Sequence, residues 1–485
     1  MSGVRLLGLD VGTSSAKGVV VDEEGRVLAE AERAYPLSTP HPGWAEQDPE
    51  DWWRAASEVL EELGADEVDG IGLTGQMHGL VVLDADQRPL RPAILWNDGR
   101  SQPQCDALVE ELGLERLVAL SGNRPLAGFT APKLRWLAEH EPDVHARIAH
   151  VLLPKDYVRL QLCGVLATDV SDASGTLLLD VGERAWSPAL AEALRVDPAW
   201  LPELLESAAV SGRTAAGVPV AAGAGDQAAG AVGMGVVGDG GPASVVLGTS
   251  GVVFAGRRAF SPDPEGRLHA FCHAVPGGWH VMGVMLSAAG SLRWLRDACG
   301  TDVGFDALVA EAEAWAPGAE GLRFAPYLAG ERTPYPDADV RAAFVGLGLR
   351  HDRGALVRSV LEGVAFGLRD SLDLIAEVGP RPPVGRVSGG GAESELWLRI
   401  LASVLDLPLE RTAVATGAAF GAALLGGVAA GTFDDVEAAI DACVHPVSRV
   451  EPDPEWVAAY AGLLAGHRAL YPMLTGGGAP GGAAT

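Results

Sequence analysis

The stretch LGLDVGTSSAKGVV, residues 7–20, consists of two apolar runs separated by a Gly-Thr-Ser turn. Apolar runs on both sides of such a turn predict a β-hairpin that reverses over residues 11–15. VVLGTSGVVFAG, residues 245–256, repeats this order of apolar run, Gly-Thr-Ser turn and apolar run. One copy stands at the head of each half of the chain. The repeat therefore predicts two related halves, with a boundary in the Gly-, Asp- and Pro-containing residues 237–244.

Strand and helix patterns alternate along the rest of the chain. Residues 22–26 predict a second hairpin turn, residues 49–63 a helix, and residues 68–84 a strand, a Gly-rich turn and another strand. Such alternation is typical of an α/β fold. We expect a first domain over residues 1–240, a second over 241–475, and a disordered Gly- and Ala-rich tail over 476–485.

The composition is that of a globular protein large enough for two cores. The chain has 485 residues, of which 48% are hydrophobic and 21% charged. A formal net charge of −28 argues against nucleic acid as a partner, because phosphate backbones are bound by excess Lys and Arg. Five scattered cysteines favour a reducing compartment over a disulfide framework or a zinc site, and no apolar run is long enough for a membrane span. We therefore expect a cytoplasmic protein with no membrane partner.

The two Gly-Thr-Ser turns are candidate phosphate sites. Backbone N–H groups of a tight turn converge on an anion and hydroxyl groups add donors, which points to Gly12 and Thr13 and to Gly248 and Thr249. The alternative for each is an ordinary hairpin turn. Asp10 directly precedes the first turn, where a carboxylate suits a Mg²⁺ ion that bridges it to phosphate. Alternatively, this carboxylate bonds the N–H groups of its own turn.

A third Gly-rich turn lies in RVSGGGAESELWLRILASVL, residues 386–405, between a strand pattern and an amphipathic helix. Backbone without Cβ atoms can approach a flat ligand closely, and the alternative is a helix start capped by Ser394 or Glu393. Two common nucleotide signatures do not apply. The sequence has no G-x-x-x-x-G-K-[ST] loop, and GMGVVG at 233–238 is followed by Gly-Pro and a strand pattern instead of a helix.

Three further stretches carry polar groups in unusual settings. Asp226 is the only charged residue in AAGVPVAAGAGDQAAGAVGMGVVG, residues 215–238, where the local pattern predicts a helix N-cap. GQMHG at 75–79 places a His at a strand end. GWAEQDPEDWW at 43–53 and WNDGR at 96–100 combine indole rings with amide and acid groups. Such mixtures suit sugar recognition and also occur in ordinary packed turns.

Taken together, these motifs resemble the FGGY carbohydrate kinases, a family within the actin-like ATPase superfamily, over almost the whole chain. The second of the family's two signatures departs at Ala355, where a polar residue is usual. The sugar-side motifs, including YLAGERTP at 327–334, are most similar to those of members that phosphorylate xylulose. The stretches that carry the resemblance are LGLDVGTSSAKGVV (7–20), VVLGTSGVV (245–253), SGGGAESELW (388–397), GFTAPKLRWLAEH (128–140) and AAFVGLGLRHDRGALVRSVLEG (342–363).

The resemblance implies an α/β fold of two actin-like (ribonuclease H-like) ATPase domains that flank a central cleft. It implies ATP-dependent phosphorylation of D-xylulose at the C5 hydroxyl, with Asp226 as general base and Asp10 as the Mg²⁺ ligand. The sugar-binding residues that it implies are Trp44, Gln76, Met77, His78, Asn97 and Asp226. The nucleotide- and phosphate-binding residues that it implies are Asp10, Gly12, Thr13, Ser14, Lys17, Gly248, Thr249, Gly389, Gly390, Gly391 and Ser394.

Two alternatives share this fold. One is a kinase for another sugar or polyol, such as ribulose, fuculose or gluconate, and the other is a non-catalytic, sugar-responsive regulator. The presence of Asp10, Asp226 and both Gly-Thr-Ser turns favours an enzyme. A homodimer is compatible with the family. Glu393 stands where the family frequently has a basic residue, and Thr416 where it often has Glu. Both positions belong to the adenosine-binding part of the pattern, so the resemblance predicts nucleotide affinity less well than the other properties.

Overall fold

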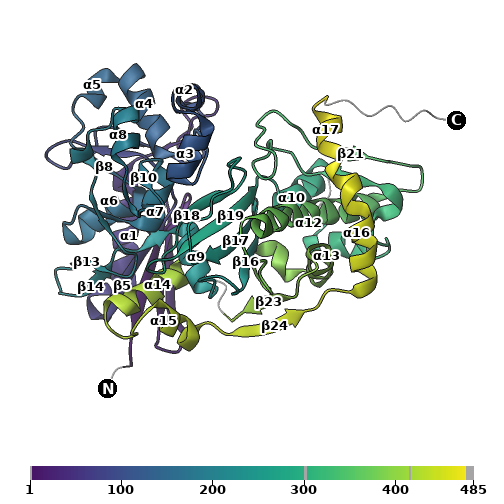
Figure 1. Ribbon diagram of the computed structural model, residues 1–485. Coiled ribbons are helices and arrows are strands. Elements are labelled where there is room, and N and C mark those ends of the chain that lie inside the picture. Colours follow the sequence, from purple (N-terminus) through teal and green to yellow (C-terminus); the bar gives the residue numbers. More distant parts are fainter. Residues whose placement is uncertain (1–2, 300–302, 414–416, 477–485) are drawn as a thin grey trace. The chain divides into compact units, whose positions relative to one another are not determined.

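The computed structural model describes residues 3–299, 303–413 and 417–476, and the chain divides into two compact units (Figure 1). Unit 1 comprises residues 1–238, 256–280 and 416–445, and unit 2 comprises residues 239–255, 281–415 and 446–485. Contacts thus place the described residues 417–445 with unit 1, whereas a division of the sequence at residue 240 places them in the second half. Thr416 and the tail over 477–485 lie outside the described residues.

Unit 1 is built on a mixed sheet with the strand order β13-β14-β5-β1-β2-β3. Both predicted N-terminal hairpins are confirmed, because β2 (Ser15–Val21) pairs antiparallel with β1 (Leu6–Val11) and with β3 (Val27–Ala34). β5 (Gly70–Gly75) pairs parallel with β1 and with β15 (Ala224–Gly225). The carboxyl ends of β1, β5 and β15 therefore lie at one edge of the sheet, where α/β proteins place their ligands.

Helices cover both faces of this sheet, and glycines in the strands allow them to approach closely. Side chains alternate between the faces of a strand. A Cβ atom at Gly18 would lie 2.5 Å from a valine side chain of α1 (Pro49–Glu62). A Cβ atom would lie 1.8 Å from a carbonyl oxygen of α14 (Gly417–Ala429) at Gly8, and 1.7 Å from another at Gly72. The backbone of α14 thus packs directly on β1 and β5, which only glycine permits.

The remaining elements of unit 1 follow the sequence predictions in kind. The predicted helix over 49–63 is α1, and the second strand predicted within 68–84 is β6, which pairs antiparallel with β8 and not with β5. The other elements of this unit are β4 (Glu46–Gln47), β6 (Val81–Leu83), β7 (Ala93–Ile94), α2 (Gln102–Leu112), α3 (Leu114–Ser121), α4 (Thr130–His140), α5 (Pro142–His145), β8 (His150–Leu152), α6 (Pro154–Cys163), β9 (Ala167–Asp169), α7 (Val170–Ala173), β10 (Leu179–Asp180), β11 (Ala185–Trp186), α8 (Pro188–Leu194), β12 (Glu203–Leu205), β13 (Val210–Arg213), β14 (Pro219–Ala221), α9 (Asp226–Gly233), β18 (His269–Cys272) and α15 (Val436–Cys443).

Unit 2 is built on strands in the order β19-β17-β16-β22-β23-β24. The second Gly-Thr-Ser hairpin is confirmed, because β16 and β17 pair antiparallel, and β16 and β22 run parallel. The last long helix, α16 (Pro454–Arg468), packs on α12 and α13 of the same unit. The elements are β16 (Ala243–Leu247), β17 (Gly251–Arg257), β19 (Trp279–Met285), α10 (Ala289–Ala298), α11 (Phe305–Ala312), β20 (Arg323–Ala325), β21 (Ala343–Val345), α12 (Arg353–Glu377), β22 (Gly385–Ser388), α13 (Glu395–Leu405), β23 (Leu409–Thr412), β24 (Pro446–Val450), α16 (Pro454–Arg468) and α17 (Leu470–Leu474).

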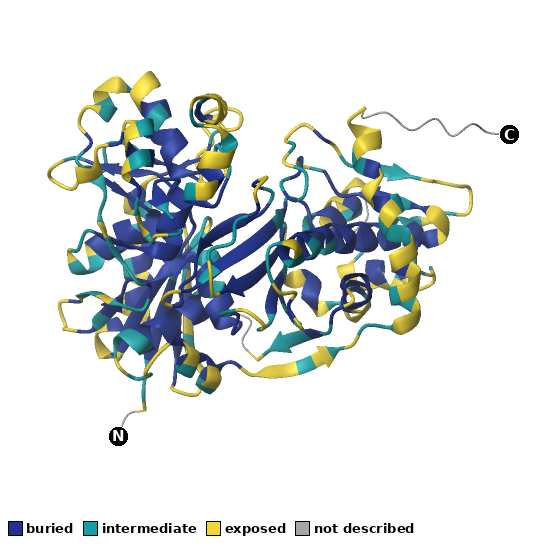
Figure 2. Cartoon of the chain, in the orientation of Figure 1, coloured by how far each residue is buried: buried dark blue, intermediate teal, exposed yellow. Residues whose placement is uncertain are grey.

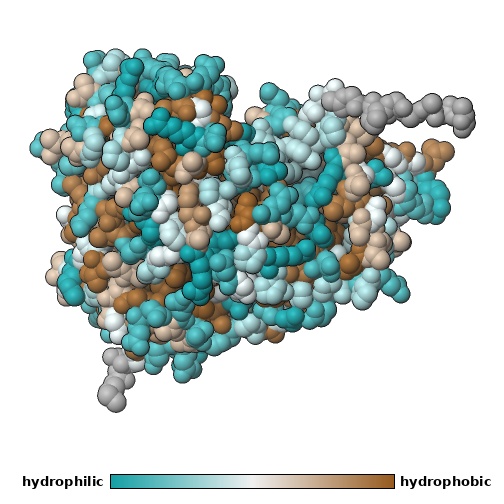
Figure 3. All heavy atoms as spheres, viewed as in Figure 1, coloured by the Kyte–Doolittle hydropathy of each residue, from teal (hydrophilic) through white to brown (hydrophobic). Residues whose placement is uncertain are grey.

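Burial follows the layers of each unit. The central strands and α12 are buried, whereas much of α2, α5 and α16 is exposed (Figure 2). The core of unit 1 contains side chains of β1, β5 and α1, among them Leu7, Leu9, Trp52, Val59 and Leu73. On the face shown in Figure 3, hydrophilic side chains are spread between smaller apolar patches. Within the described part of the chain, none of the helices combines the length and the apolar character needed to cross a membrane.

Candidate active site

The structure brings Asp10 and Asp226 to neighbouring strand ends in unit 1. In the sheet register, Asp10 of β1 lies beside Thr74 of β5, and Thr74 lies beside Ala224 of β15. Asp226 is the first residue of α9, two positions after Ala224. The predicted N-cap position is off by one, because the cap is Gly225. The first turn of a helix is nevertheless a favourable place for an ionised carboxylate.

The two carboxyl groups have raised pKa values. Burial, reinforced by the charge of Asp226, raises the pKa of Asp10 to about 7, although Lys17 on the paired strand lowers it. Burial also raises the pKa of Asp226 to about 6, opposed by the Gln227 side chain, whose Nε2 lies 3.3 Å from Asp226 Oδ1. Lys17 forms an ion pair with Glu30 at 3.4 Å. A carboxylate with a pKa near 6 is deprotonated at neutral pH and is more basic than an ordinary one, as a general base requires.

Asp10 offers an oxygen atom that fits a hard cation. Its Oδ1 is buried and has no hydrogen-bond partner among residues 3–299, 303–413 and 417–476. In the same ranges, no group of three or more His, Cys, Asp or Glu side chains is arranged to hold a metal. Mg²⁺ commonly takes one or two carboxylates from a protein and completes its shell with phosphate and water. The residues present therefore fit Mg²⁺ accompanied by a phosphate ligand.

The first Gly-Thr-Ser turn is fixed by its carbonyl groups. The N–H of Gly12 closes the turn by donating to a carbonyl three residues further on, at 3.0 Å. The Gly12 carbonyl accepts from Gln76 Nε2 at 3.2 Å, and the Thr13 carbonyl accepts from Gln47 Nε2 at 2.7 Å. In the described structure no acceptor is paired with the N–H groups of Thr13 and Ser14. The turn thus presents two backbone donors, as an anion-binding turn does.

Met77 and His78 follow β5 directly and lie next to the segment that carries Asp226. A Cβ atom at Gly225 would lie 2.8 Å from Met77 Cγ, so the buried Met77 side chain covers the residue before Asp226. His78 has a φ of 69°, which is uncommon for a residue with a side chain. Its Nδ1 lies 2.8 Å from the carbonyl oxygen of Gly175. The predicted sugar contacts and the predicted base are therefore parts of one local arrangement.

A buried lysine fixes the backbone of this loop. Lys133 of α4 is fully buried, and its Nζ lies 2.9 Å from the carbonyl oxygen of His78, 3.2 Å from that of Ile94 and 2.7 Å from that of Gly128. The hydroxyl of Thr130 donates to the same His78 carbonyl at 3.1 Å. Burial lowers the pKa of Lys133 well below its ordinary value. An ammonium group has three N–H donors, so these three carbonyls use all of them, and Lys133 joins three separate segments of the chain.

The two indole-rich stretches, 43–53 and 96–100, make different contacts near the candidate site. Trp96 is 40% exposed, and its Nε1 donates to Thr13 Oγ1 at 3.0 Å, whereas Asn97 is exposed beside it. The guanidinium of Arg100 covers one ring face of Trp44, 3.6 Å from the ring centroid. Trp96 thus connects the indole-rich loop at 96–100 with the first Gly-Thr-Ser turn. One stacking face of Trp44 is already occupied.

In unit 2 the second Gly-Thr-Ser turn joins β16 and β17. The carbonyl of Gly248 accepts from the N–H of Ala289 at 2.8 Å, and the carbonyl of Thr249 accepts from the N–H of Ala288 at 2.9 Å. The Thr249 side chain is exposed. As in unit 1, the carbonyl groups of the turn bond the protein, which leaves the outward side of the turn to its N–H and hydroxyl groups.

The third Gly-rich turn leaves the sheet at the same edge as this hairpin, because Val246 of β16 pairs in parallel with Ser388 of β22. Gly389 has a φ of 87°, and a Cβ atom there would lie 2.6 Å from the carbonyl oxygen of Leu247. A Cβ atom at Gly390 would have nothing within 4 Å. The backbone at Gly390 therefore faces open space, where a flat ligand can approach it.

The capping interpretation of Ser394 is confirmed, since its Oγ accepts from the N–H of Trp397 at 3.2 Å. Gly391 is buried, and Glu393 is exposed. Arg411 of β23 donates through Nε to a carbonyl of the turn at 2.9 Å. Ser394 thus has a structural role in starting α13, and its contact with a nucleoside stays a prediction.

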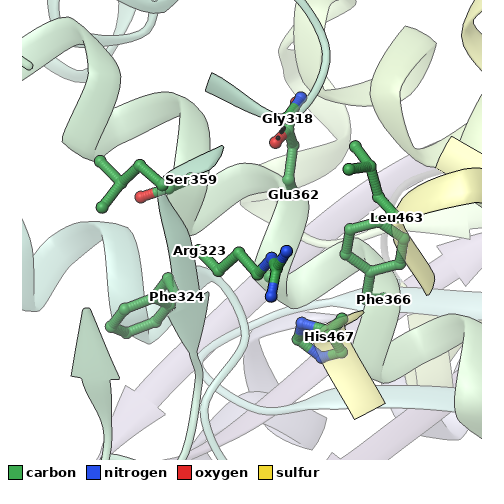
Figure 4. A pocket seen from close by; sticks show the side chains of 10 residues that line it. Gly318, Arg323, Phe324, Ser359, Glu362, Phe366, Leu463 and His467 are labelled. Atoms are coloured by element: carbon green, nitrogen blue, oxygen red, sulfur yellow. Dashed lines mark hydrogen bonds between the residues drawn. The ribbon is translucent and has the colours of Figure 1, made fainter. Parts of the chain in front are cut away.

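A small cavity in unit 2 is not a substrate site. It has a volume of about 20 Å³, and Arg323, Glu362, Phe366 and His467 point toward it from β20, α12 and α16 (Figure 4). A space of this size holds about one water molecule and neither a sugar nor a nucleotide. This cavity is therefore not part of the candidate site at the strand ends and turns described above.

Comparison with known proteins decides the family. Residues 5–233 match the N-terminal domain of the FGGY family of carbohydrate kinases, and residues 243–430 match its C-terminal domain. The chain belongs to the FGGY family of carbohydrate kinases. FGGY kinases transfer a phosphoryl group from ATP to a sugar, and the predicted α/β fold with two domains is confirmed.

Curated FGGY relatives and solved structures match nearly the whole chain. The xylulose kinase of Escherichia coli (strain K12) is 42% identical over 482 residues, which cover 96% of this chain and 99% of the relative. The xylulose kinase of Bacillus subtilis (strain 168) is 36% identical over 482 residues, with 96% of each covered. A crystal structure of a xyloylose kinase from Brucella ovis is 43% identical, with a TM-score of 0.92 and coverage of 98% and 100%. A xylulose kinase structure from Rhodospirillum rubrum is 32% identical, with a TM-score of 0.90 and coverage of 97% and 99%.

Sequence reasoning missed three residues that hold the site together, namely Gln47, Trp96 and Lys133. Each lies inside a stretch that the sequence analysis quoted. Which member of such a stretch faces the site depends on contacts with distant residues, so no local pattern distinguishes it. The one available signal is a polar side chain in an apolar helical pattern, as Lys133 has in GFTAPKLRWLAEH.

Proposed function

We propose that this chain phosphorylates D-xylulose at its C5 hydroxyl at the expense of ATP, with Asp226 as the general base. The observation that carries this proposal is the placement of Asp10, Met77 and Asp226 around neighbouring strand ends in a chain 42% identical to a xylulose kinase over 96% of its length. The relatives support the choice of sugar. The geometry supports the choice of base.

Asp226 would accept the proton of the attacking hydroxyl. A neutral alcohol is a weak nucleophile, and a positioned base typically contributes roughly 10²- to 10⁴-fold in rate. With a pKa of about 6, Asp226 is deprotonated at neutral pH. The neighbouring Gly225 has no side chain, which lets Met77 pack directly against the backbone beside the base.

The first Gly-Thr-Ser turn would bind the phosphoryl group that is transferred. Its donors are the N–H groups of Thr13 and Ser14, which the carbonyl bonds to Gln76 and Gln47 hold in place. Donors that are fixed before the reaction stabilise transition-state charge without reorganisation. Asp10 would hold Mg²⁺, which neutralises charge on the phosphate when it is bound.

The sugar would lie against Gln76, Met77 and His78, with Trp44 and Asn97 from the indole-rich loops. Met77 supplies an apolar wall next to Gly225, and the Lys133 ammonium fixes the carbonyl of His78. In unit 2, the turns at 248–250 and 389–391 would bind the nucleotide. The open backbone at Gly390 is the contact for its base.

The substrate is tested by steady-state kinetics with saturating MgATP and a panel of D-xylulose, L-ribulose, D-ribulose, L-fuculose, gluconate and glycerol. We expect the highest kcat/KM for D-xylulose. A tenfold preference for another member of the panel would overturn the choice of sugar and leave the kinase assignment standing.

A further inference from the structure

Unit 1 contains a cluster of five ionisable side chains that expose no surface. Lys155 Nζ lies 2.7 Å from Asp156, 2.9 Å from Asp169 and 3.1 Å from Asp172. Arg159 is paired with Asp156 at 2.7 Å. Removing a charge from water costs several kcal/mol even after relaxation, so a buried ion cluster is weak evidence for stability. The contacts of the cluster with the neighbouring backbone indicate its role better than its contribution to stability.

The cluster reaches the segment before Asp226 through Ser171. The Ser171 hydroxyl donates to Asp169 Oδ2 at 2.5 Å and accepts from the N–H of Gly225 at 3.2 Å. A hydroxyl group has a single proton to donate. Because Ser171 donates this proton in its hydrogen bond to Asp169, only the lone pairs of its oxygen are left to accept from the N–H of Gly225. Gly225 is the N-cap of α9, which begins at Asp226.

The same segment has two further anchors. Arg159 of the cluster donates to the carbonyl of Ala222, three residues before Gly225. Met77 covers Gly225 from another direction, since a Cβ atom there would lie 2.8 Å from Met77 Cγ. With Ser171 on its N–H, Gly225 has little freedom in position or direction.

We propose that Ser171, oriented by Asp169, is the positioning residue for Asp226: it fixes the N–H of Gly225 and thereby the direction in which the Asp226 carboxylate projects. This inference rests on the proposed role of Asp226 as general base. A reacting group displaced by about 1 Å can lose on the order of 100-fold in rate, so a single backbone hydrogen bond at this position has a measurable kinetic effect.

Ser207 provides a matched control for Ser171. Its hydroxyl also donates to Asp169 Oδ2, at 2.8 Å, and it is equally buried. Within the described residues, no hydrogen bond joins the Ser207 hydroxyl to Gly225. Ser171→Ala and Ser207→Ala therefore remove the same kind of bond from Asp169, and Ser171→Ala alone also releases Gly225.

The test compares kcat and both KM values of the two variants, with thermal unfolding as the stability readout. We expect kcat to fall 10- to 100-fold in Ser171→Ala and less than threefold in Ser207→Ala, with KM for D-xylulose and for ATP within threefold of wild type in both. Equal kcat values in the two variants would overturn the inference. Should Ser171→Ala fail to fold, Ser171→Cys keeps the volume and weakens the acceptor. Wild-type kcat in Ser171→Cys would then overturn it.

Asp226→Asn distinguishes failure of this inference from failure of the proposed function. Wild-type turnover in Asp226→Asn would remove Asp226 as the base, and with it the inference. Loss of turnover in Asp226→Asn together with normal kcat in Ser171→Ala would remove the inference alone. Because Ser171 acts through Asp226, adding Ser171→Ala to Asp226→Asn should change the residual rate less than twofold.

Discussion

The burial of Asp226 predicts how turnover depends on pH. Burial raises its pKa from 3.8 to about 6, and hydrogen bonds from Gln227 limit the rise. A general base acts only when it is deprotonated, so kcat/KM for the sugar should rise with pH through about 6 and level off above pH 7. A raised pKa means that the proton is retained to higher pH, so activity is lost on the acid side. Asp10 lies nearby with a pKa of about 7, and the two carboxyls titrate as a pair.

The size of the effect separates this base from an ordinary carboxyl. A group with a pKa of about 6 is about 91% deprotonated at pH 7 and about 9% at pH 5, so kcat/KM should fall roughly tenfold between these values. A carboxyl with the usual pKa would lose less than about a tenth of its ionised form over the same range. Because the Gln227 side chain lowers the pKa of Asp226, Gln227→Leu should move the acid limb to higher pH.

The assay is coupled ADP release at saturating MgATP from pH 5 to pH 8, with protein stability checked at each pH. Asp226→Asn should lose about 10²- to 10⁴-fold in kcat and should show no acid limb with a pKa of about 6. A flat wild-type profile between pH 5 and pH 7, or an unchanged acid limb in Asp226→Asn, would show that Asp226 is not the base whose ionisation controls turnover.

Further predictions concern Lys133, the packing of helix α14 and the buried side chain of His273. Lys133→Met removes donors to three carbonyls, so KM for the sugar should rise at least tenfold with KM for ATP unchanged, and unchanged initial rates at low sugar would contradict this. Gly72→Ala would place a Cβ 1.7 Å from a carbonyl of α14 and should lower Tm, at a cost of about 1–3 kcal/mol or more, whereas Gly462→Ala meets nothing within 4 Å and should leave Tm unchanged or raise it. Equal Tm values for these two variants would count against the packing. Burial lowers the pKa of His273 to about 4, so the unfolded chain takes up the proton first as pH falls. Urea unfolding should therefore show wild type losing about 2 kcal/mol relative to His273→Gln between pH 7 and pH 5; parallel curves would disprove it.

Local signals explain which parts of the fold were predictable. Turn residues, caps and periodicity within a few neighbouring positions predict the hairpins at 6–21 and 243–257 and the helices α1 and α13. The packing of α14 on unit 1 was not predictable, because it joins residues about 400 positions apart. Its one trace in the sequence is the presence of Gly8 and Gly72 inside strands, where glycine signals a close backbone approach.

The candidate site also contains residues that local motifs predict and residues that only the structure identifies. The resemblance to a known family predicts roles for Asp10, Met77 and Asp226, and the structure brings these residues to neighbouring strand ends. Lys133 bonds the backbone of His78, 55 positions away, and Ser171 bonds the backbone of Gly225, 54 positions away. Every residue type except proline has the same backbone N–H and C=O groups, so the sequence does not show which of them a side chain bonds. Only the structure identifies these partners.

The position of the phosphate in the product tests directly whether this chain phosphorylates D-xylulose at C5. D-xylulose and ATP are incubated with the protein, and the position of the phosphate is read from ³¹P–¹H correlation NMR of the product. The phosphorus should correlate with the two protons on C5, and Asp226→Asn should form this product about 10²- to 10⁴-fold more slowly. A phosphate on another carbon would contradict the proposed product, and formation of the same product at the wild-type rate by Asp226→Asn would contradict the proposed base.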